Sequence, residues 1–217
     1  MNGTRLKDAE MVVNQPYETN QAESQILHPG SRALFSFWET MRAENAAPLR
    51  GALDLKRIGD LVPNLMIIEP GPRPGGFRWR LAGTAVCGLY QRELTGTNAL
   101  LGWDNFEAHV VGRFLTGVVK GLQPCLLRFR LHTDLHQMVG AELVGMPLQA
   151  GNGSGIQVFG GVFAFRDIQS LGYRAITAIE LSGARSIWTE QLPGDPLSQE
   201  KRHPVPLFQL IKGGRSP

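Results

Sequence analysis

The stretch that decides the fold is Phe77-Arg78-Trp79-Arg80-Leu81-Ala82-Gly83-Thr84. Its strict alternation puts Phe77, Trp79 and Leu81 on one face of a β-strand and the arginines on the other, because successive strand side chains point to opposite faces. Gly83 permits a tight exit from the strand into a following helix. The stretch therefore predicts a half-buried strand that ends at the start of a helix.

Four further strands are expected around this one. Residues 65–69 form a largely apolar run after a proline and predict a buried strand. Residues 125–132 alternate between apolar and polar side chains, and residues 138–148 predict the next strand. Residues 156–165 are apolar on both faces, which is typical of a central strand covered from both sides. Residues 173–188 fit either a helix or a strand.

Helices are expected before and between these strands. Apolar residues recur at helical spacing between Leu34 and Met41, so an amphipathic helix is predicted to begin at a Ser31 cap and to end before Pro48. One or two short helices are expected within residues 83–96. The first helix needs a surface to cover, because one of its faces is apolar.

A longer helix is predicted between an Asp104 cap and Pro124. At about 100° per residue, its apolar side chains gather on one side; they are Phe106, Val110, Val111, Phe114, Leu115 and Val118. The opposite side carries His109, Arg113, Thr116 and Lys120. The pattern therefore predicts that Phe106 faces the sheet and that His109 faces water.

The composition favours one principal domain with two flanks. The chain has 217 residues, of which 42% are hydrophobic and 19% charged, and this range is typical of a globular core. We expect a flexible arm over residues 1–27, a domain over residues 28–170 that includes the first helix, and an extension over residues 171–217.

The sequence also predicts a cytoplasmic protein. No apolar run approaches the roughly 18 residues that cross a bilayer, and the first ten residues are polar where a signal peptide would be apolar. Cys87 and Cys125 are too few for a disulfide framework and fit a reducing compartment. We therefore expect two thiols and no contact with a membrane.

The order strand, strand, short helices, long helix, three strands resembles the PAS fold. That fold is α+β, with an antiparallel five-stranded sheet and a helical layer on one face; here an N-terminal flanking helix is added. Phe37-Trp38, Leu61-Val62-Pro63-Asn64-Leu65, the stretch from Phe77 to Thr84 and Leu94-Thr95-Gly96 resemble a bacterial, mostly alphaproteobacterial, family of PAS-like proteins that often stand alone. The resemblance covers residues 31–170.

The resemblance implies a sensory or protein-interaction module without its own catalytic output. The partner would be a second copy in a homodimer or another signalling protein. The expected partner interface is Leu34, Phe35, Trp38 and Met41. A small apolar ligand would occupy a cavity between the sheet and the helices, lined by Phe77, Trp79, Leu81, Phe106, Val110, Phe114, Phe129 and Leu131. Apolar faces of this kind are also explained by ordinary core packing.

No cofactor and no metal are expected. A flavin photosensor of the PAS type needs a cysteine where Gly96-Thr97-Asn98-Ala99 has alanine. A haem domain needs an inward histidine from the helical layer, and His109 lies on the polar side of its helix. His132 and His136 with Asp134 suggest a metal site, but polar residues of a hairpin turn explain them better.

Two other functions were weighed. Cys125 alternates in phase with Leu127 and Phe129 and is therefore predicted to be a buried hydrophobe rather than a nucleophile, and we expect no enzyme. The alternative is a small-molecule enzyme that uses His132, Asp134 and His136 near a cavity mouth.

Nucleic-acid binding would use Arg78 and Arg80 with Arg128 and Arg130. The net charge of +3 is modest, and a PAS-like strand order puts the two pairs on opposite edges of the sheet, which argues against this function.

Overall fold

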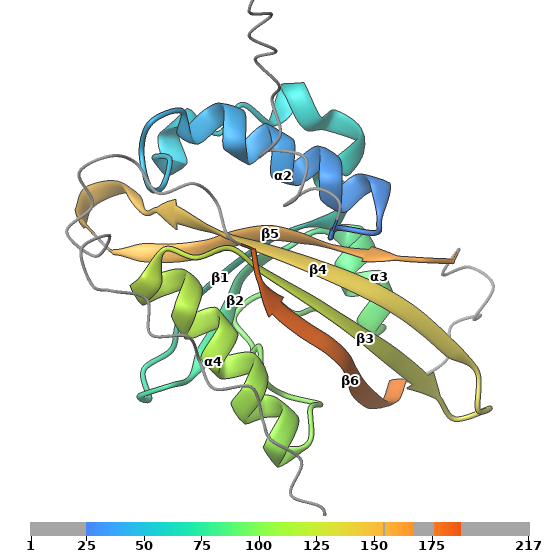
Figure 1. The fold of residues 1–217 in the computed structure, drawn as a ribbon. Coiled ribbons are helices and arrows are strands. Elements are labelled where there is room, and N and C mark those ends of the chain that lie inside the picture. Colours follow the sequence, from blue (N-terminus) through green and yellow to red (C-terminus); the bar gives the residue numbers. More distant parts are fainter. Residues whose placement is uncertain (1–24, 154, 167–175, 188–217) are drawn as a thin grey trace, which may run out of the picture.

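The computed structural model describes residues 25–153, 155–166 and 176–187. Most of the predicted arm over residues 1–27 and most of the predicted extension over residues 171–217 lie outside these ranges. The fold is α+β, as predicted, and consists of one antiparallel sheet with helices on both of its faces (Figure 1). Within the described ranges, every helix is too short or too polar to span a bilayer.

The sheet has six strands in the order β2-β1-β5-β4-β3-β6, and each neighbouring pair is antiparallel. The strands are β1 (Leu65–Pro70), β2 (Phe77–Ala82), β3 (Cys125–Thr133), β4 (Met138–Gln149), β5 (Ile156–Ala164) and β6 (Ile176–Ser186). Five of them are those predicted from the sequence.

The sixth strand, β6, corrects the predicted number of five. It comes from the segment whose identity was left open, and it pairs with β3 along the whole length of that strand. The last strand of the sheet therefore lies within residues 171–217, which the sequence predicted to be a C-terminal extension. Two register shifts, at Arg128/Phe129 and at His132/Thr133, interrupt the pairing, and a bulge of this kind weakens a two-residue alternation.

Helices cover both faces of the sheet (Figure 1). They are α2 (Pro29–Arg42), α3 (Thr84–Tyr90) and α4 (Asn105–Gly121), together with the short 3₁₀ helices η1 (Arg50–Ala52), η2 (Leu55–Asn64) and η3 (Gly151–Gly153). α3 and α4 lie on one face and α2 lies on the other. Asp104 caps α4, as predicted, since its carboxylate accepts from the Glu107 amide at 2.7 Å.

The cap of α2 differs from the prediction. His28 occupies the N-cap, and its Nδ1 accepts from the Gly30 amide at 3.0 Å. Ser31 is instead the third residue of the helix and is fully buried. Pro29 explains the earlier start, because proline is favoured in the first turn of a helix, where its missing N–H has no partner to lose.

The two faces of the sheet enclose two hydrophobic cores. We call the cluster beneath α3 and α4 the helical-layer core and the cluster beneath α2 the flank core. Neighbouring residues of β1 divide between them: Met66 and Ile68 belong to the helical-layer core, and Leu65 and Ile67 belong to the flank core. Both faces of the central strands are thus buried, as the apolar run of residues 156–165 predicted.

Gly83 joins β2 to α3 and is needed there for a steric reason. It is the N-cap of α3 with an ordinary φ of −68°. A Cβ atom at this position would lie 2.2 Å from the carbonyl oxygen of Pro63. The predicted tight exit from β2 therefore depends on the close approach of η2, and not on an unusual backbone conformation.

Candidate functional site

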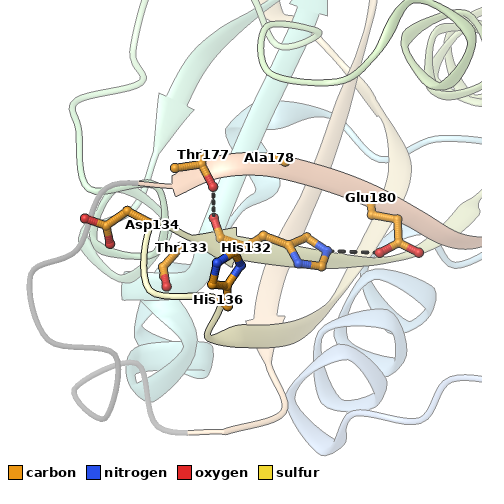
Figure 2. Close-up of a pocket in the computed structure, with 7 residues that line it drawn as sticks. All are labelled: His132, Thr133, Asp134, His136, Thr177, Ala178 and Glu180. Carbon is orange, nitrogen blue, oxygen red and sulfur yellow. Dashed lines mark hydrogen bonds and ion pairs between the residues drawn. The ribbon is translucent and has the colours of Figure 1, made fainter.

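Polar side chains gather at the turn between β3 and β4, where β6 begins (Figure 2). They line an open concavity of about 580 Å³, formed by His132, Thr133, Asp134, His136, Thr177, Ala178 and Glu180. His132 Nε2 lies 2.9 Å from Glu180 Oε2, and Arg130 donates to the other oxygen of that carboxylate at 3.0 Å. The hydrogen bond from His132, together with the charge of Arg130, lowers the pKa of Glu180.

The three residues predicted as a metal site or a polar turn do not converge on one point. Asp134 lies on the far side of the turn from Glu180 (Figure 2), and His136 is exposed with a left-handed φ of 58°. In the described part of the chain, no three histidine, cysteine or acidic side chains are close enough together to hold a metal ion. The histidine–glutamate pair is therefore the chemically distinctive feature of this concavity.

The four arginines weighed for nucleic-acid binding are all engaged in ion pairs. Arg78 and Arg80 lie 2.7 and 3.9 Å from the Glu69 carboxylate. Arg128 pairs with Glu142 and Arg130 pairs with Glu180. β2 is an edge strand, as expected, but β6 pairs with the outer side of β3. The two pairs of arginines therefore do not occupy opposite edges of the sheet. Each positive charge already faces a carboxylate, and this weakens the case for a basic patch.

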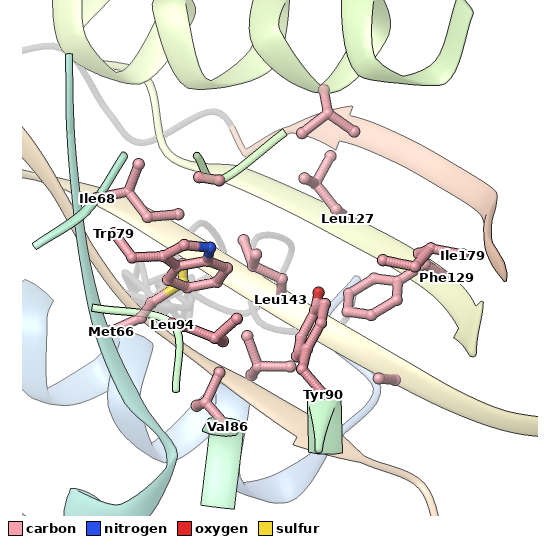
Figure 3. Close-up of a cluster of buried hydrophobic side chains, with 14 of the residues drawn as sticks. Met66, Ile68, Trp79, Val86, Tyr90, Leu94, Leu127, Phe129, Leu143 and Ile179 are labelled. Atoms are coloured by element: carbon pink, nitrogen blue, oxygen red, sulfur yellow. The ribbon is translucent and has the colours of Figure 1, made fainter. Parts of the chain in front are cut away.

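Four of the eight residues predicted to line a ligand cavity belong to the helical-layer core, part of which is shown in Figure 3. Phe77, Trp79, Phe129 and Leu131 are buried, as predicted. Trp79 meets Tyr90 edge-on, with ring centroids 6.1 Å apart, and burial raises the pKa of the Tyr90 hydroxyl. Aromatic and aliphatic side chains thus pack against one another in the space where the sequence predicted a ligand.

Leu81 is a correction, because it leaves this core and is 41% exposed. The register between β1 and β2 shifts at Ile67/Ile68: Trp79 pairs with Ile68, Leu81 pairs with Ile67, and Arg80 has no partner between them. Residues that pair directly share a face of the sheet. The extra residue therefore turns Leu81 towards the α2 face and ends the alternation that the sequence predicted.

Phe106 is a second correction, since it is 76% exposed. Val110 and Phe114 are half-buried, and of the two only Phe114 packs against the edge of the helical-layer core. The buried face of α4 is formed by Val111, Gly112, Leu115 and Val118. The sheet meets the side of α4 opposite to Phe106. At about 100° per residue, Arg113 and Lys120 share the outer side with Phe106, and the prediction that they lie opposite it is wrong.

Cys125 and His109, the histidine considered as a haem ligand, lie as their patterns predicted. Cys125 is buried, and desolvation raises the pKa of its thiol to about 12, so it is a protonated hydrophobe. His109 is exposed on α4. Ala99, at the position where a flavin photosensor would need cysteine, is buried, and its amide donates to the carbonyl oxygen of Phe77 at 2.9 Å.

The predicted partner interface is used within the chain itself. Leu34, Phe35 and Trp38 are buried in the flank core, and Met41 packs half-buried at its edge. These side chains cover the sheet, so they contact a partner only if α2 leaves it. The contacts that hold α2 in place therefore decide whether this surface is accessible.

Strand β4 holds α2 at two points. At the start of the helix, the fully buried Glu142 carboxylate accepts from the amides of Leu27 and His28 at 3.1 and 2.9 Å and from Arg128 Nε at 2.9 Å. Further along, Trp38 Nε1 donates to the carbonyl oxygen of Pro147 at 2.8 Å. The helix is therefore attached to one strand by directional polar contacts as well as by apolar packing.

His28 links the cap of α2 to the sheet. Its ring stacks on Phe163 at 5.0 Å, while Nδ1 accepts from the Gly30 amide. Burial lowers the pKa of His28, and the nearby Glu142 charge opposes this shift. The neutral ring is the form that can accept the capping hydrogen bond.

Sequence reasoning missed both Glu142 and His28. The available signal was a single acidic residue within the apolar run of residues 138–148, because a buried carboxylate requires partners. Alternate residues of this strand face the two cores: Ala141 and Leu143 face the helical-layer core, while Val144 and Met146 face α2. β4, like β5, therefore contributes to both the helical-layer core and the flank core, and β4 also carries the two polar attachments of α2. We take β4 with these two attachments as the candidate functional site.

Residues 26–163 match a protein family that is described as PAS domain. The match begins just before α2 and ends within β5, so it includes the helix and Glu142 but not β6. Comparisons with curated proteins and with solved structures found no match.

Proposed function

From the premise that this chain belongs to the PAS domain family, we propose that a small apolar ligand in the helical-layer core changes how α2 is held, and that a partner detects this change. Sensory and protein-interaction modules are typical of this family. The partner is a second copy of the chain or another signalling protein, in the cytoplasm. The expectation of a stand-alone bacterial protein rests on the sequence resemblance described above.

The observation that carries this proposal is the alternation along β4. Leu143 packs into the helical-layer core, while its neighbours Glu142 and Val144 contact α2 or its start. A ligand that displaces Leu143 moves the backbone to which α2 is attached. Ligand binding would thereby shift the population between a docked and a loosened α2, to the extent that the ligand prefers one of the two states.

The test uses indole as a probe and two matched variants of β4. Ala141→Val adds two carbon atoms on the helical-layer side, and Val144→Ile adds one carbon atom on the flank side; both residues are fully buried. Hydrogen exchange of residues 29–42 is measured with and without indole. We expect indole to change this exchange in the wild-type chain and in Val144→Ile, but not in Ala141→Val, because only the latter reduces the ligand space.

Two results would contradict the proposal. If indole alters exchange in α3 and α4 but leaves α2 unchanged in every variant, the coupling through β4 is wrong. If native mass spectrometry of the chain from its own host finds no bound molecule and indole does not bind, a ligand is not the input.

The proposed module has no catalytic output of its own. The observation that favours the alternative is the concavity at the β3–β4 turn, where His132 contacts Glu180 at 2.9 Å. A carboxylate-bound imidazole can act as a general base in a small-molecule enzyme. Replacing His132, Asp134 and His136 together by alanine decides the matter, because any turnover that survives the triple replacement does not come from this site.

A further inference from the structure

The outer side of α4 carries a row of residues that we call the outer seam, and its apolar members belong to neither hydrophobic core. Phe106, Val110, Arg113, Gly117 and Lys120 follow one another at alternating intervals of four and three residues. This spacing keeps side chains on one face of a helix and is the spacing by which two helices pack along a common seam. Phe106 is 76% exposed, Val110 is half-buried, and Arg113 and Lys120 are exposed.

The inward side of α4 packs against the sheet without any residue of this seam. Val111, Leu115 and Val118 are buried against the sheet, and they satisfy the apolar requirement of a helix that covers it. Figure 1 shows α4 lying along the face of the sheet, so its opposite side points away from the molecule. The exposed ring of Phe106 therefore has no role in the packing of the described part of the chain.

The shape of the seam suits a second helix. Phe106 and Val110 form a raised apolar end, whereas a Cβ atom built at Gly117 would meet nothing within 4 Å. A glycine in a helix surface allows another backbone to approach closely, and a bulky residue one or two turns away provides an anchor. α4 spans 17 residues, or about 25 Å, which is enough for several turns of contact.

The charge of the seam indicates the chemistry of its occupant. The sheet arginines Arg78, Arg80, Arg128 and Arg130 are all in ion pairs. By contrast, Arg113 and Lys120 form no ion pair within the described ranges, and His109 lies beside them. Two cations in the packing positions of a seam require carboxylates opposite them, because burying an unpaired charge is costly.

We propose that the outer seam of α4 is the docking surface for an acidic amphipathic helix of a partner protein. Phe106 and Val110 bind its apolar stripe, Gly117 admits its backbone, and Arg113 and Lys120 pair with its carboxylates. A second copy of this chain fits less well, because antiparallel pairing of two such seams places the two Arg113 side chains together. The proposal rests on the proposed interaction function and names the chemistry of its partner.

The experiment measures binding of two synthetic peptides to the full chain by fluorescence anisotropy at low salt. Both peptides repeat leucine at alternating three- and four-residue intervals; one carries glutamate at the flanking positions, and the other carries lysine there. We expect the glutamate peptide to bind about tenfold or more tightly than the lysine peptide, and Arg113→Glu with Lys120→Glu to reverse this preference. Phe106→Ala is expected to weaken the glutamate peptide about tenfold or more, because it removes the anchor.

Lys56→Glu is the matched control, because Lys56 is an exposed cation on η2, away from the seam. It should leave the peptide preference unchanged. The proposal is overturned if the glutamate peptide fails to bind, if it binds as well to the Phe106→Ala variant, or if Lys56→Glu changes the preference as much as the α4 reversals do. The indole experiment reports on α2, so it can succeed while this one fails, and the two proposals are tested separately.

Discussion

The two faces of the sheet are closed in different ways. On the helical-layer face, the contacts of Trp79, Tyr90, Phe129 and their neighbours are apolar packing. On the α2 face the packing is equally apolar, but more polar groups are buried with it. Within the described part of the chain, Ser31, Arg42, Glu142 and Gln157 are buried on α2 or on the strand positions facing it, whereas Thr133, at the end of β3, is the buried polar residue on the helical-layer face. Apolar packing has little directionality, whereas a few hydrogen bonds can be broken one at a time. The comparison predicts that the first face contributes more to the stability of the domain, and the proposed function requires that α2 can detach from the second.

The largest expected effect comes from breaking the helical-layer face. Phe129→Ala removes a fully buried ring from β3, the strand beside the edge strand β6, and should lower the free energy of unfolding by about 3 to 5 kcal/mol. Chemical denaturation followed by circular dichroism measures this loss. A loss below about 1 kcal/mol would mean that the packing around Phe129 collapses readily and that this face is not the main support.

Removing the buried carboxylate tests the α2 face. Glu142→Ala leaves Arg128 and the amides of Leu27 and His28 without their acceptor, and we expect a loss of about 3 kcal/mol, with faster hydrogen exchange at residues 25–32.

Glu180→Ala is the matched control for this change. Glu180 also pairs with an arginine of β3, but its side chain is 49% exposed, so the expected loss of stability is much smaller than for Glu142→Ala. Equal losses in the two variants would show that the burial of Glu142 has no special role in holding α2.

A smaller effect is expected from the second attachment of α2. Trp38→Phe keeps most of the apolar contact but leaves the carbonyl oxygen of Pro147 unpaired, and it should cost about 1 to 2 kcal/mol. The exchange of α2 should rise more than that of α4. If exchange rises equally in both helices, α2 does not detach on its own.

The smallest effect is a dependence on pH. Because burial lowers the pKa of His28 below its ordinary value of 6.5, the folded chain prefers the neutral ring. The contribution of His28 to stability is therefore complete above about pH 6.5 and declines as the pH falls below it. Glu142 opposes this preference and Arg32 reinforces it.

His28→Asn keeps an N-cap acceptor that does not titrate. The free energy of unfolding, measured by denaturation between pH 7 and pH 5, should fall less steeply in this variant than in the wild-type chain. Parallel curves for the two proteins would exclude His28 as the titrating group.

The sequence predicted the elements better than their orientation. Alternation in residues 125–132 and the apolar run of residues 156–165 were enough to identify β3 and β5, because a period of two residues is a local property of the chain. Alternation failed at Leu81, because Arg80 has no register partner on β1 and shifts the phase of β2 against that strand. Only the pairing of two strands reveals such a bulge.

The candidate site was less accessible from the sequence. Leu34, Phe35 and Trp38 were correctly placed on one helix face, but that face covers the chain's own sheet. The Glu142 carboxylate accepts hydrogen bonds from Leu27 and His28, which lie 115 and 114 positions away in the sequence. No local pattern contains this information. β6 escaped prediction because an edge strand with two register shifts carries little alternation.

From the sequence alone followed the periods of the strands and helices, the cap of α4 at Asp104, and the PAS-like α+β class of the domain. The tertiary structure alone decided which arc of α4 faces the sheet, which face of β2 carries Leu81, and which amides the Glu142 carboxylate accepts. The reason is physical. A period depends on the covalent geometry of neighbouring residues, whereas the orientation of each element and the partners of buried polar groups depend on contacts between distant segments.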